Sequence, residues 1–373
     1  MTTELFIKPC DIFMPRGNSH FGVNSGDFGQ IRILPAPSIF AGAIRSFIAS
    51  TNIEDLKQIE KGERPVTEKI AGCLGSLKES KKFPGTFRIG QVCLCRKTKD
   101  GSYEPIYRMP SDIVVFEEDH KIASIKHLLP SEPISGIKGS SELPKTAILQ
   151  AANMKPAGGY WLIKDGFQKY LNGGLPDKGD CIKESDLWKK QMRTGVALNG
   201  QTRSAEEGML YTTECLSFCD GVGFAVEVIG ADELLPETGL LSLGGEARGA
   251  VFEKIKDFSE PSADFSKIAE QKRFKLLLTA PAIFPDGWLP DEQLFPAKLV
   301  CASVKGYETL SGWNMVENRP KDAVRTVPAG SVYWFEDFEG TASDLQEGLQ
   351  NYFIPEDKQR YVEGFNKAVI AAW

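Results

Sequence analysis

Alternating apolar and polar positions, interrupted by glycine and proline, predict the elements of the first fifty residues. Residues 4–13 alternate as a half-buried strand does, and the glycines between 17 and 29 favour irregular backbone. Two prolines at 35 and 37 prevent an earlier helix start, so Ser38 is the expected N-cap of an amphipathic helix. The apolar stripe of this helix has i, i+3, i+4 spacing and comprises Phe40, Ala43, Ile44, Phe47 and Ile48.

Strand patterns return at 86–96 and 103–116, joined by the turn sequence Lys99–Ser102. From about 117 to 190 the pattern weakens, and Lys, Glu, Pro and Gly become frequent. We therefore expect this stretch to be an insertion of loops and short helices, with one helix over 184–192.

Two further strand patterns, 209–219 and 223–230, follow the insertion. A short apolar run at 250–252 comes next, and the polar stretch 256–272, which contains a proline, is expected to be a linker. The last hundred residues repeat the opening theme. Their predicted elements are strands at 274–278, 299–304 and 332–335, a helix at 344–352 and a closing segment at 361–373.

Two successive patterns of strands and helices predict an α+β protein with two ferredoxin-like, RNA-recognition-like domains in tandem. The first domain is expected over residues 1–258, with the long insertion at about 117–190 inside it. The second domain is expected over residues 259–373.

The composition is that of a globular protein. The 373 residues are 42% hydrophobic and 25% charged, which excludes disordered and collagen-like classes. No apolar run approaches the ~18 residues of a membrane helix, and residues 1–7 lack the pattern of a secretory signal, so no membrane partner is expected. The eight cysteines are irregularly spaced, and we expect reduced thiols in the cytoplasm and no disulfide framework.

The charge balance is mildly acidic. The chain has 44 Lys and Arg against 50 Asp and Glu, a formal net charge of −6. Such a chain is a poor candidate for binding naked nucleic acid through a diffuse long-range field. A local strip of cations, or a complex whose other subunits supply the field, still allows binding.

Histidine and cysteine give weak signals. His20, in the glycine-rich loop, is a candidate general base on a ribose hydroxyl, but its spacing indicates no partner and a contact or structural role is favoured. His120 and His127 are expected to be incidental. Four cysteines could hold zinc but lack Cys-x₂-Cys pairs, so core packing is expected, and no metal or cofactor. These are Cys93, Cys95, Cys215 and Cys219.

Two loops and one aromatic patch have chemistry suited to RNA. The stretch Arg193–Tyr211 combines arginines with small hydroxyl and amide residues, which suit a phosphodiester or a base edge, unless its arginines pair with nearby glutamates. Glycines in the loop Gly244–Gly249 allow a nucleic-acid backbone to approach closely, or simply form a turn. Trp313, near Arg319 and Arg325, could stack on an unpaired base or cap a core.

These motifs occur in a recognisable order along the chain. They are Pro15-Arg16-Gly17 with Phe21-Gly22 and Leu34–Arg45, Arg193–Val196 with Thr202–Tyr211, Leu243–Arg248, Leu278–Phe284 with Gly287-Trp288, Ser311–Trp313 with Arg319–Lys321 and Val327–Tyr333, and the closing Gly364–Trp373. Together they resemble the family of subunit three of the Cmr complex, RAMP-superfamily proteins of type III-B CRISPR effectors. The resemblance spans the chain apart from the insertion.

The resemblance implies two ferredoxin-like domains and no catalytic chemistry. It also implies that the chain holds the 5′ repeat-derived handle of the CRISPR RNA, docks on the large palm-domain subunit and contacts the adjacent backbone RAMP subunit. The expected backbone contacts are Arg45, Arg193, Arg203 and Arg248, and the expected handle-reading donors are Asn199, Gln201 and Thr202. Further expected RNA-binding residues are Asn18, His20, Met209, Gly244, Gly245, Trp313, Arg319 and Arg325.

Two alternatives stay open at the level of sequence. One is a metal-independent CRISPR-RNA processing endoribonuclease of the same superfamily, in which His20 acts with a nearby Tyr or Lys. The other is a purely structural adaptor that binds the large subunit through exposed apolar surface.

Overall fold

The computed structural model describes most of the chain. The described residues are 2–14, 28–29, 34–79, 82, 84–133, 141–150, 155–245, 248–256, 258, 260–291, 295–314, 316–352 and 358–373. Within these ranges, the side chains of 28–29, 206–209, 211, 350–352 and 358 lie outside the description.

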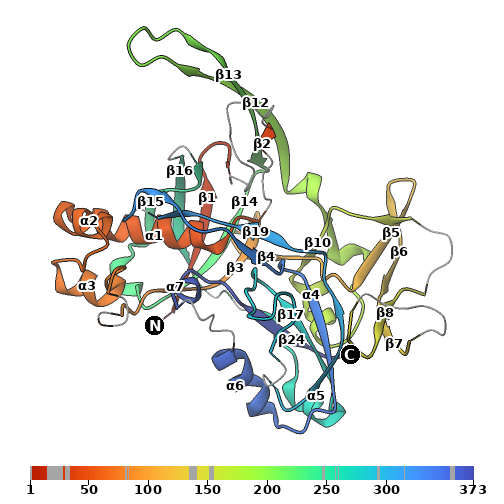
Figure 1. Ribbon diagram of the computed structural model, residues 1–373. Coiled ribbons are helices and arrows are strands. Elements are labelled where there is room, and N and C mark those ends of the chain that lie inside the picture. Colours follow the sequence, from red (N-terminus) through yellow and green to blue (C-terminus); the bar gives the residue numbers. More distant parts are fainter. Residues whose placement is uncertain are drawn as a thin grey trace.

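An antiparallel sheet of eight strands dominates the N-terminal part (Figure 1). In spatial order its strands are β11 (Cys181–Lys183), β10 (Tyr160–Ile163), β4 (Tyr103–Arg108), β3 (Arg88–Lys97), β14 (Val222–Ile229), β1 (Thr2–Pro9), β16 (Gly249–Ile255) and β15 (Thr238–Ser242). The strand patterns expected from 4, 86, 103 and 223 are thereby confirmed, although 103–116 is split into two strands.

Helix α1 (Pro37–Ser50) covers one face of this sheet and confirms the expected amphipathic helix, since Phe40 and Ile44 are fully buried against the strands. Its N-cap, however, is Ala36, not Ser38, because Pro37 already occupies the first helical turn, where its missing N–H has no cost. Two short helices follow, α2 (Ile53–Glu60) and α3 (Glu68–Leu74).

A second, four-stranded antiparallel sheet is built from the C-terminal part of the chain. Its order is β18 (Lys298–Ser303), β23 (Val332–Glu336), β17 (Phe274–Leu278) and β24 (Ala368–Ala371). Helices α6 (Ala342–Tyr352) and α7 (Lys358–Val362) precede β24. The expected linker at 256–272 is wrong in part: it contains α5 (Phe265–Gln271), whose N-cap Asp264 accepts hydrogen bonds from the N–H groups of Ser266 and Lys267.

The two sheets share one order of strands. In the large sheet the adjacent strands β3, β14, β1 and β16 are the second, third, first and fourth of their set along the chain. The small sheet has the same order, with β18, β23, β17 and β24. One connecting helix differs: α1 lies between the first two strands of the large sheet, whereas α6 and α7 lie between the last two strands of the small one. The fold is a mixed α/β fold with several separate sheets.

A hydrophobic core joins the two sheets. It contains Phe6, Cys93 and Cys95 from the large sheet and Leu277, Val332 and Trp334 from the small one, all less than a tenth exposed. In this core the ammonium of Lys275 lies 3.0 Å from the carboxylate of Asp112, which also accepts a hydrogen bond of 2.9 Å from the Tyr170 hydroxyl. The predicted boundary between residues 258 and 259 stays a prediction.

The insertion is more regular than expected. It supplies β10, β11 and helix α4 (Lys164–Leu171) to the large sheet and its cover. Its remaining strands form small sheets beside the C-terminal part, and they are β5 (Ile113–Glu118), β6 (Lys121–His127), β7 (Leu129–Ser131), β8 (Thr146–Ile148) and β9 (Pro156–Ala157). The helix expected over 184–192 is wrong: a 3₁₀ turn at Glu184–Asp186 is followed by a strand from Trp188.

Within the described residues no helix is long and apolar enough to cross a membrane. All eight cysteines are free thiols.

Candidate nucleic-acid interface

A long two-stranded arm projects from the body of the molecule (Figure 1). It consists of β12 (Trp188–Leu198) and β13 (Ala205–Phe218), and β2 (Phe28–Gly29) pairs with β13 at Thr212 and Thr213. The base of the arm is buried, since Trp188, Cys215 and Leu216 are at most 2% exposed. The candidate loop at 193–211 is therefore a hairpin held at its base by the core.

The tip of the arm is organised by one amide side chain. The Oδ1 atom of Asn199 accepts hydrogen bonds from the N–H groups of Gln201 at 3.0 Å and Thr202 at 3.1 Å. Arg203 has a left-handed φ of 56°, which closes the turn. As a result, Gln201, Thr202 and Arg203 are exposed at the tip. The side-chain carbonyl of Asn199 already accepts two backbone hydrogen bonds, so its side-chain NH₂ group is the part that can donate to a partner.

The two faces of the arm differ in chemistry. Directly paired residues of antiparallel strands lie on the same face, so Arg193 lies beside Thr213 on one face. The other face has Met192 opposite Glu214 and Val196 opposite Leu210. Met192 is 64% and Leu210 71% exposed, so this face carries an uncovered apolar stripe. Met209 belongs to β13, but its side chain is outside the description.

Arg45 does not have the exposed guanidinium that an RNA contact needs. It lies on the inner side of α1 and is 8% exposed, and its Nη2 donates a hydrogen bond of 3.1 Å to the carbonyl oxygen of Leu74. Burial lowers the pKa of this guanidinium, and its charge centre lies 5.8 Å from the centre of the Phe87 ring. Its geometry is that of a packing residue that joins α1 to α3, and this corrects the expected backbone contact.

The glycine loop lies at the base of the arm. Gly244 has a φ of 81°, and a Cβ there would approach the Phe13 ring to 3.1 Å, so close packing requires glycine. The N–H of Gly245 donates to the carbonyl of Met14 at 3.1 Å. Arg248 is engaged as well, since it pairs with Asp11 at 3.1 Å. Phe13 in turn bridges to Leu216 of the arm, so the loop supports the base of the arm.

The aromatic patch lies on a second hairpin, residues 307–327, which we call the strap. Its strands are β19 (Glu308–Leu310), β20 (Trp313–Asn314), β21 (Arg319–Pro320) and β22 (Val324–Thr326). Trp313 is 56% exposed, which favours contact over core packing. Arg325 lies over the ring of the exposed Tyr307 at 4.9 Å, whereas Arg319 pairs with Glu317 at 2.6 Å.

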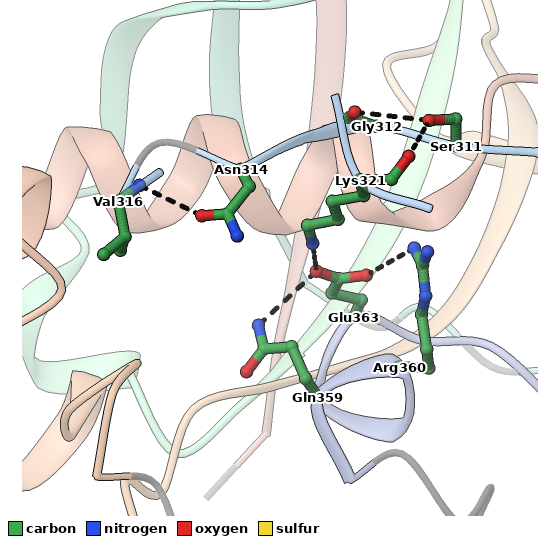
Figure 2. Close-up of polar contacts among 8 residues, drawn as sticks. All are labelled: Ser311, Gly312, Asn314, Val316, Lys321, Gln359, Arg360 and Glu363. Atoms are coloured by element: carbon green, nitrogen blue, oxygen red, sulfur yellow. Dashed lines mark hydrogen bonds and ion pairs between the residues drawn. The ribbon is translucent and has the colours of Figure 1, made fainter. Parts of the chain in front are cut away.

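The strap is anchored to the body at two places, near Lys321 and near Val316. Figure 2 shows Glu363 between Lys321 and Arg360: its Oε1 accepts from Lys321 Nζ at 2.7 Å and its Oε2 from Arg360 Nη1 at 3.2 Å. Farther out, Val316 packs onto Gly62, just beyond α2, where a Cβ would come within 2.5 Å of it. The strap passes in front of α1 in Figure 1.

The expected RNA-binding residues thus fall into groups. Arg193, Asn199, Gln201, Thr202 and Arg203 share the arm, and Trp313, Arg319 and Arg325 share the strap. Asn18 and His20 lie outside the described residues. The apolar stripe of the arm was not among the expected features, although the alternation of Met192, Val196 and Leu198 was a signal for an exposed strand.

In the described part of the chain, no group of three or more His, Cys, Asp or Glu side chains is arranged to hold a metal ion. Cys93 and Cys95 are buried between the sheets, whereas Cys215 packs with Ile12 and Met14 at the base of the arm. The candidate cysteines therefore belong to separate clusters.

Comparisons with known proteins give a consistent picture. The family model described as "CRISPR-associated protein (Cas_Cmr3)" matches residues 5–373. A chain of the cryo-EM structure of the type III-B Cmr-beta bound to cognate target RNA is similar, with a TM-score of 0.50 and 16% identity over 98% of this chain and 96% of that one. A chain of the same assembly with cognate target RNA and AMPPnP gives 0.50 and 14%, over 98% and 95%. At these identities the likeness shows the fold. No curated protein matches the sequence.

Proposed function

The chain belongs to the Cmr3 family of CRISPR-associated proteins, and from this premise we propose that it is a non-catalytic RNA-binding subunit of a type III-B effector complex in the cytoplasm. In this role it holds the 5′ repeat-derived handle of the CRISPR RNA, docks on the large palm-domain subunit and contacts the adjacent backbone RAMP subunit. The similar chains come from complexes bound to target RNA, which supports membership of such an assembly.

The arm is the single observation that carries the RNA-binding part of the proposal. The side chains of Gln201, Thr202 and Arg203 are exposed at the tip of this ribbon, where a partner can reach them. Its exposed donors, together with the Asn199 amide, suit phosphates and base edges of a single strand. A partner that covers the arm would also cover the apolar stripe of Met192, Val196 and Leu210 on the opposite face.

The arm gives a net-acidic chain a local group of cations. Arg193 and Arg203 are both exposed on the arm, away from the acidic body. A hydrogen bond from a guanidinium to a phosphate contributes roughly 1.5–3 kcal/mol when desolvated and much less at an exposed rim. Two such contacts are enough to position a handle whose affinity is completed by neighbouring subunits.

The strap is a second candidate contact for unpaired bases. Trp313 is exposed, and the Arg325–Tyr307 pair offers a flat cationic surface elsewhere on the same strap. Both kinds of surface stack on splayed bases.

The repeated strand order supports the finer part of the fold proposal, that each half is a ferredoxin-like unit. The second, third, first and fourth strands lie side by side in both sheets, which is the strand order of the β-α-β-β-α-β ferredoxin-like motif. Among the described residues each unit then lacks one of the two connecting helices, and the core between the sheets lies on the face opposite α1 and α6.

The test is crosslinking of CRISPR RNA to the chain co-purified with the large subunit. Arg193→Glu with Arg203→Glu is expected to reduce crosslinks at the 5′ handle by tenfold or more, because both contacts become repulsive. The matched control, Arg64→Glu with Lys267→Glu, makes the same change of charge at exposed positions off the arm and should leave the crosslinks unchanged. Unchanged crosslinks in the arm variant would remove the assignment of the arm.

The two alternatives give different outcomes. A processing nuclease would cut labelled repeat RNA, and the cuts would disappear in His20→Ala. A structural adaptor would show handle crosslinks that map only to other subunits.

A further inference from the structure

One end of the large sheet is left open on the face opposite α1. A groove with a volume of about 1090 Å³ lies there, over β1, β3, β15 and β16, beside the area that the small sheet covers. Leu240 and Val251 are direct partners on β15 and β16 and line the groove, and they are 62% and 46% exposed. Two adjacent aliphatic side chains therefore face solvent on this part of the sheet.

The outer strand of this region is an unprotected edge. Among the described strands, β15 pairs only with β16, so its other side has unpaired backbone groups. Its sequence, Thr-Gly-Leu-Leu-Ser, contains no charge and no proline, the two residue types that normally protect an edge. The opposite edge of the same sheet, β11, has only three residues and ends in Lys183, which pairs with Glu117 at 2.9 Å.

On the face of β15 that lies toward α1, an aromatic side chain could also contact an added strand. The Phe47 ring packs over Gly239, where a Cβ would come within 3.2 Å of it, and makes an edge contact with the Phe252 ring. Phe47 is only half-buried. A strand added beside β15 would place alternate side chains against Leu240 on one face and Phe47 on the other.

The charges and rings of the groove favour a polypeptide over RNA. Its lining has four cations, Lys8, Arg96, Lys97 and Lys99, against two carboxylates, Asp220 and Glu253. Three of the cations are already paired with carboxylates: Lys8 with Asp220 at 3.2 Å, Lys97 with Glu253 at 2.7 Å, and Arg96 with Glu104, outside the lining, at 2.6 Å. Among the described residues, Lys99 therefore carries the excess positive charge of the lining. The lining phenylalanines, Phe6 and Phe252, are 3% and 2% exposed, so neither presents a ring face on which a base could stack.

From these observations we propose that an extended, acidic and apolar segment of a neighbouring protein subunit adds to the free edge of β15 as a further strand. Backbone hydrogen bonds to β15 supply its affinity, and the Leu240–Val251 pair together with the Lys99 ammonium selects its side chains. The proposal depends on the proposed function only in that the neighbour is another subunit of the effector.

Hydrogen exchange tests the proposal on the isolated chain and on the effector complex reconstituted with its CRISPR RNA. Exchange at the outward-pointing amides of 238–242 is expected to slow by at least about tenfold on assembly, because a new strand hydrogen bonds them, whereas the alternate amides already face β16. Leu240→Asp with Val251→Asp should abolish the slowing, since both positions are exposed and the new carboxylates repel an acidic segment. The control Ile53→Asp with Val66→Asp changes two equally exposed aliphatic residues elsewhere and should retain it.

Three results would overturn the proposal. Exchange at 238–242 could stay unchanged on assembly, or CRISPR RNA alone could slow it in the isolated chain, which would assign the groove to RNA. Slowing that depends on the concentration of the isolated chain would assign the edge to a second copy. RNA crosslinks measured on the same samples separate the two proposals. If the edge of β15 stays unprotected while the crosslinks at the arm are intact, only the strand addition is contradicted. If the edge is protected while the crosslinks at the arm are lost, only the RNA assignment is contradicted.

Discussion

Glu363 shows how a single carboxylate can hold a peripheral hairpin in place. Its side chain and that of Arg360 are both 6% exposed, so the pair is removed from water and depends on its hydrogen bonds (Figure 2). Lys321 of the strap, which is partly exposed, completes the network from the outside. The position of Trp313 and Arg325 therefore depends on a residue far from them in sequence.

Glu363→Gln is expected to lower the free energy of unfolding by about 3–5 kcal/mol, because the buried guanidinium of Arg360 loses its compensating charge. Urea denaturation measures this difference. Glu317→Gln, which removes the exposed partner of Arg319, should change the stability by less than about 0.5 kcal/mol. Equal effects of the two substitutions would contradict a structural role for Glu363.

Glu4 is a residue whose protonation should be visible in stability. Burial, with a smaller effect of the neighbouring Glu227 and Glu260 charges, raises the pKa of Glu4 to about 8, and its Oε2 atom is buried without a hydrogen-bond partner. The native state therefore keeps a proton that the unfolded chain releases near pH 4.5. The stability that this proton contributes is present below pH 4.5 and is lost as the pH rises to 8.

In Glu4→Gln this pH-dependent loss should disappear. The difference in unfolding free energy between wild type and variant should change by at most about 1.4 kcal/mol per pH unit between pH 5 and 8. Urea denaturation at four pH values in this range provides the measurement, and parallel profiles for the two proteins would show that Glu4 is ionised in the native state.

At the scale of elements, one residue of the arm shapes its tip and others are exposed by it, although the sequence pattern predicted the same RNA-contacting role for all of them. Asn199 shapes the tip through its carbonyl, while the residues after it are presented by the turn. The glycine loop, expected as an RNA contact, lies against Phe13 and Met14 and supports the base of the arm. An element can therefore contribute to binding by holding another element in position.

Substitutions of Asn199 distinguish shaping from contact. Asn199→Ala removes the acceptor of two backbone N–H groups, so amide exchange at Gln201 and Thr202 should accelerate, by about the fivefold that a loss of ~1 kcal/mol implies. Asn199→Asp keeps the acceptor and should leave exchange unchanged. If the amide of Asn199 also donates to RNA, the Asp variant will still weaken handle crosslinks; crosslinks equal to wild type would leave Asn199 with the turn alone.

At the scale of the whole molecule, the core that the two sheets share contains a buried ion pair. The side chain of Asp112 is 1% exposed and that of Lys275 6%, and the Lys275 ammonium also lies 3.9 Å from the centre of the Tyr170 ring. Three parts of the chain meet here: the residue just before β5, helix α4 of the insertion and strand β17. The ion pair fixes how the halves face each other, since neither charge tolerates displacement.

Asp112→Asn should destabilise the chain by about 3–5 kcal/mol, because Lys275 becomes an uncompensated buried cation. Adding Lys275→Met should recover most of this loss, since an apolar side chain of similar length replaces the charge. Calorimetry of the single and double variants tests both statements. A double variant as unstable as Asp112→Asn would show that the network contributes by hydrogen bonding, not by charge pairing.

Elements with a clear hydrophobic period, or bounded by glycine and proline, could be predicted from the sequence. The helix with the Phe40–Ile44 stripe, the turn at Lys99–Ser102 and most strands of the two sheets follow from residues close together in the chain, because their periodicity shows which side is apolar. Strands β10, β11 and β15 were not predicted in this way. The ordered motifs also carried the family resemblance, which the family match over residues 5–373 confirms.

Which polar side chains can reach a partner outside the chain depends on how the chain packs. Arg45 and Arg193 have the same side chain, yet the first is buried against α3 and the second stands on a projecting ribbon. The pairings of Asp112 with Lys275 and of Lys321 with Glu363 join residues 163 and 42 positions apart. Local periodicity contains no information on such partners, because they are set by how the sheets and hairpins pack, and packing is a property of the whole chain.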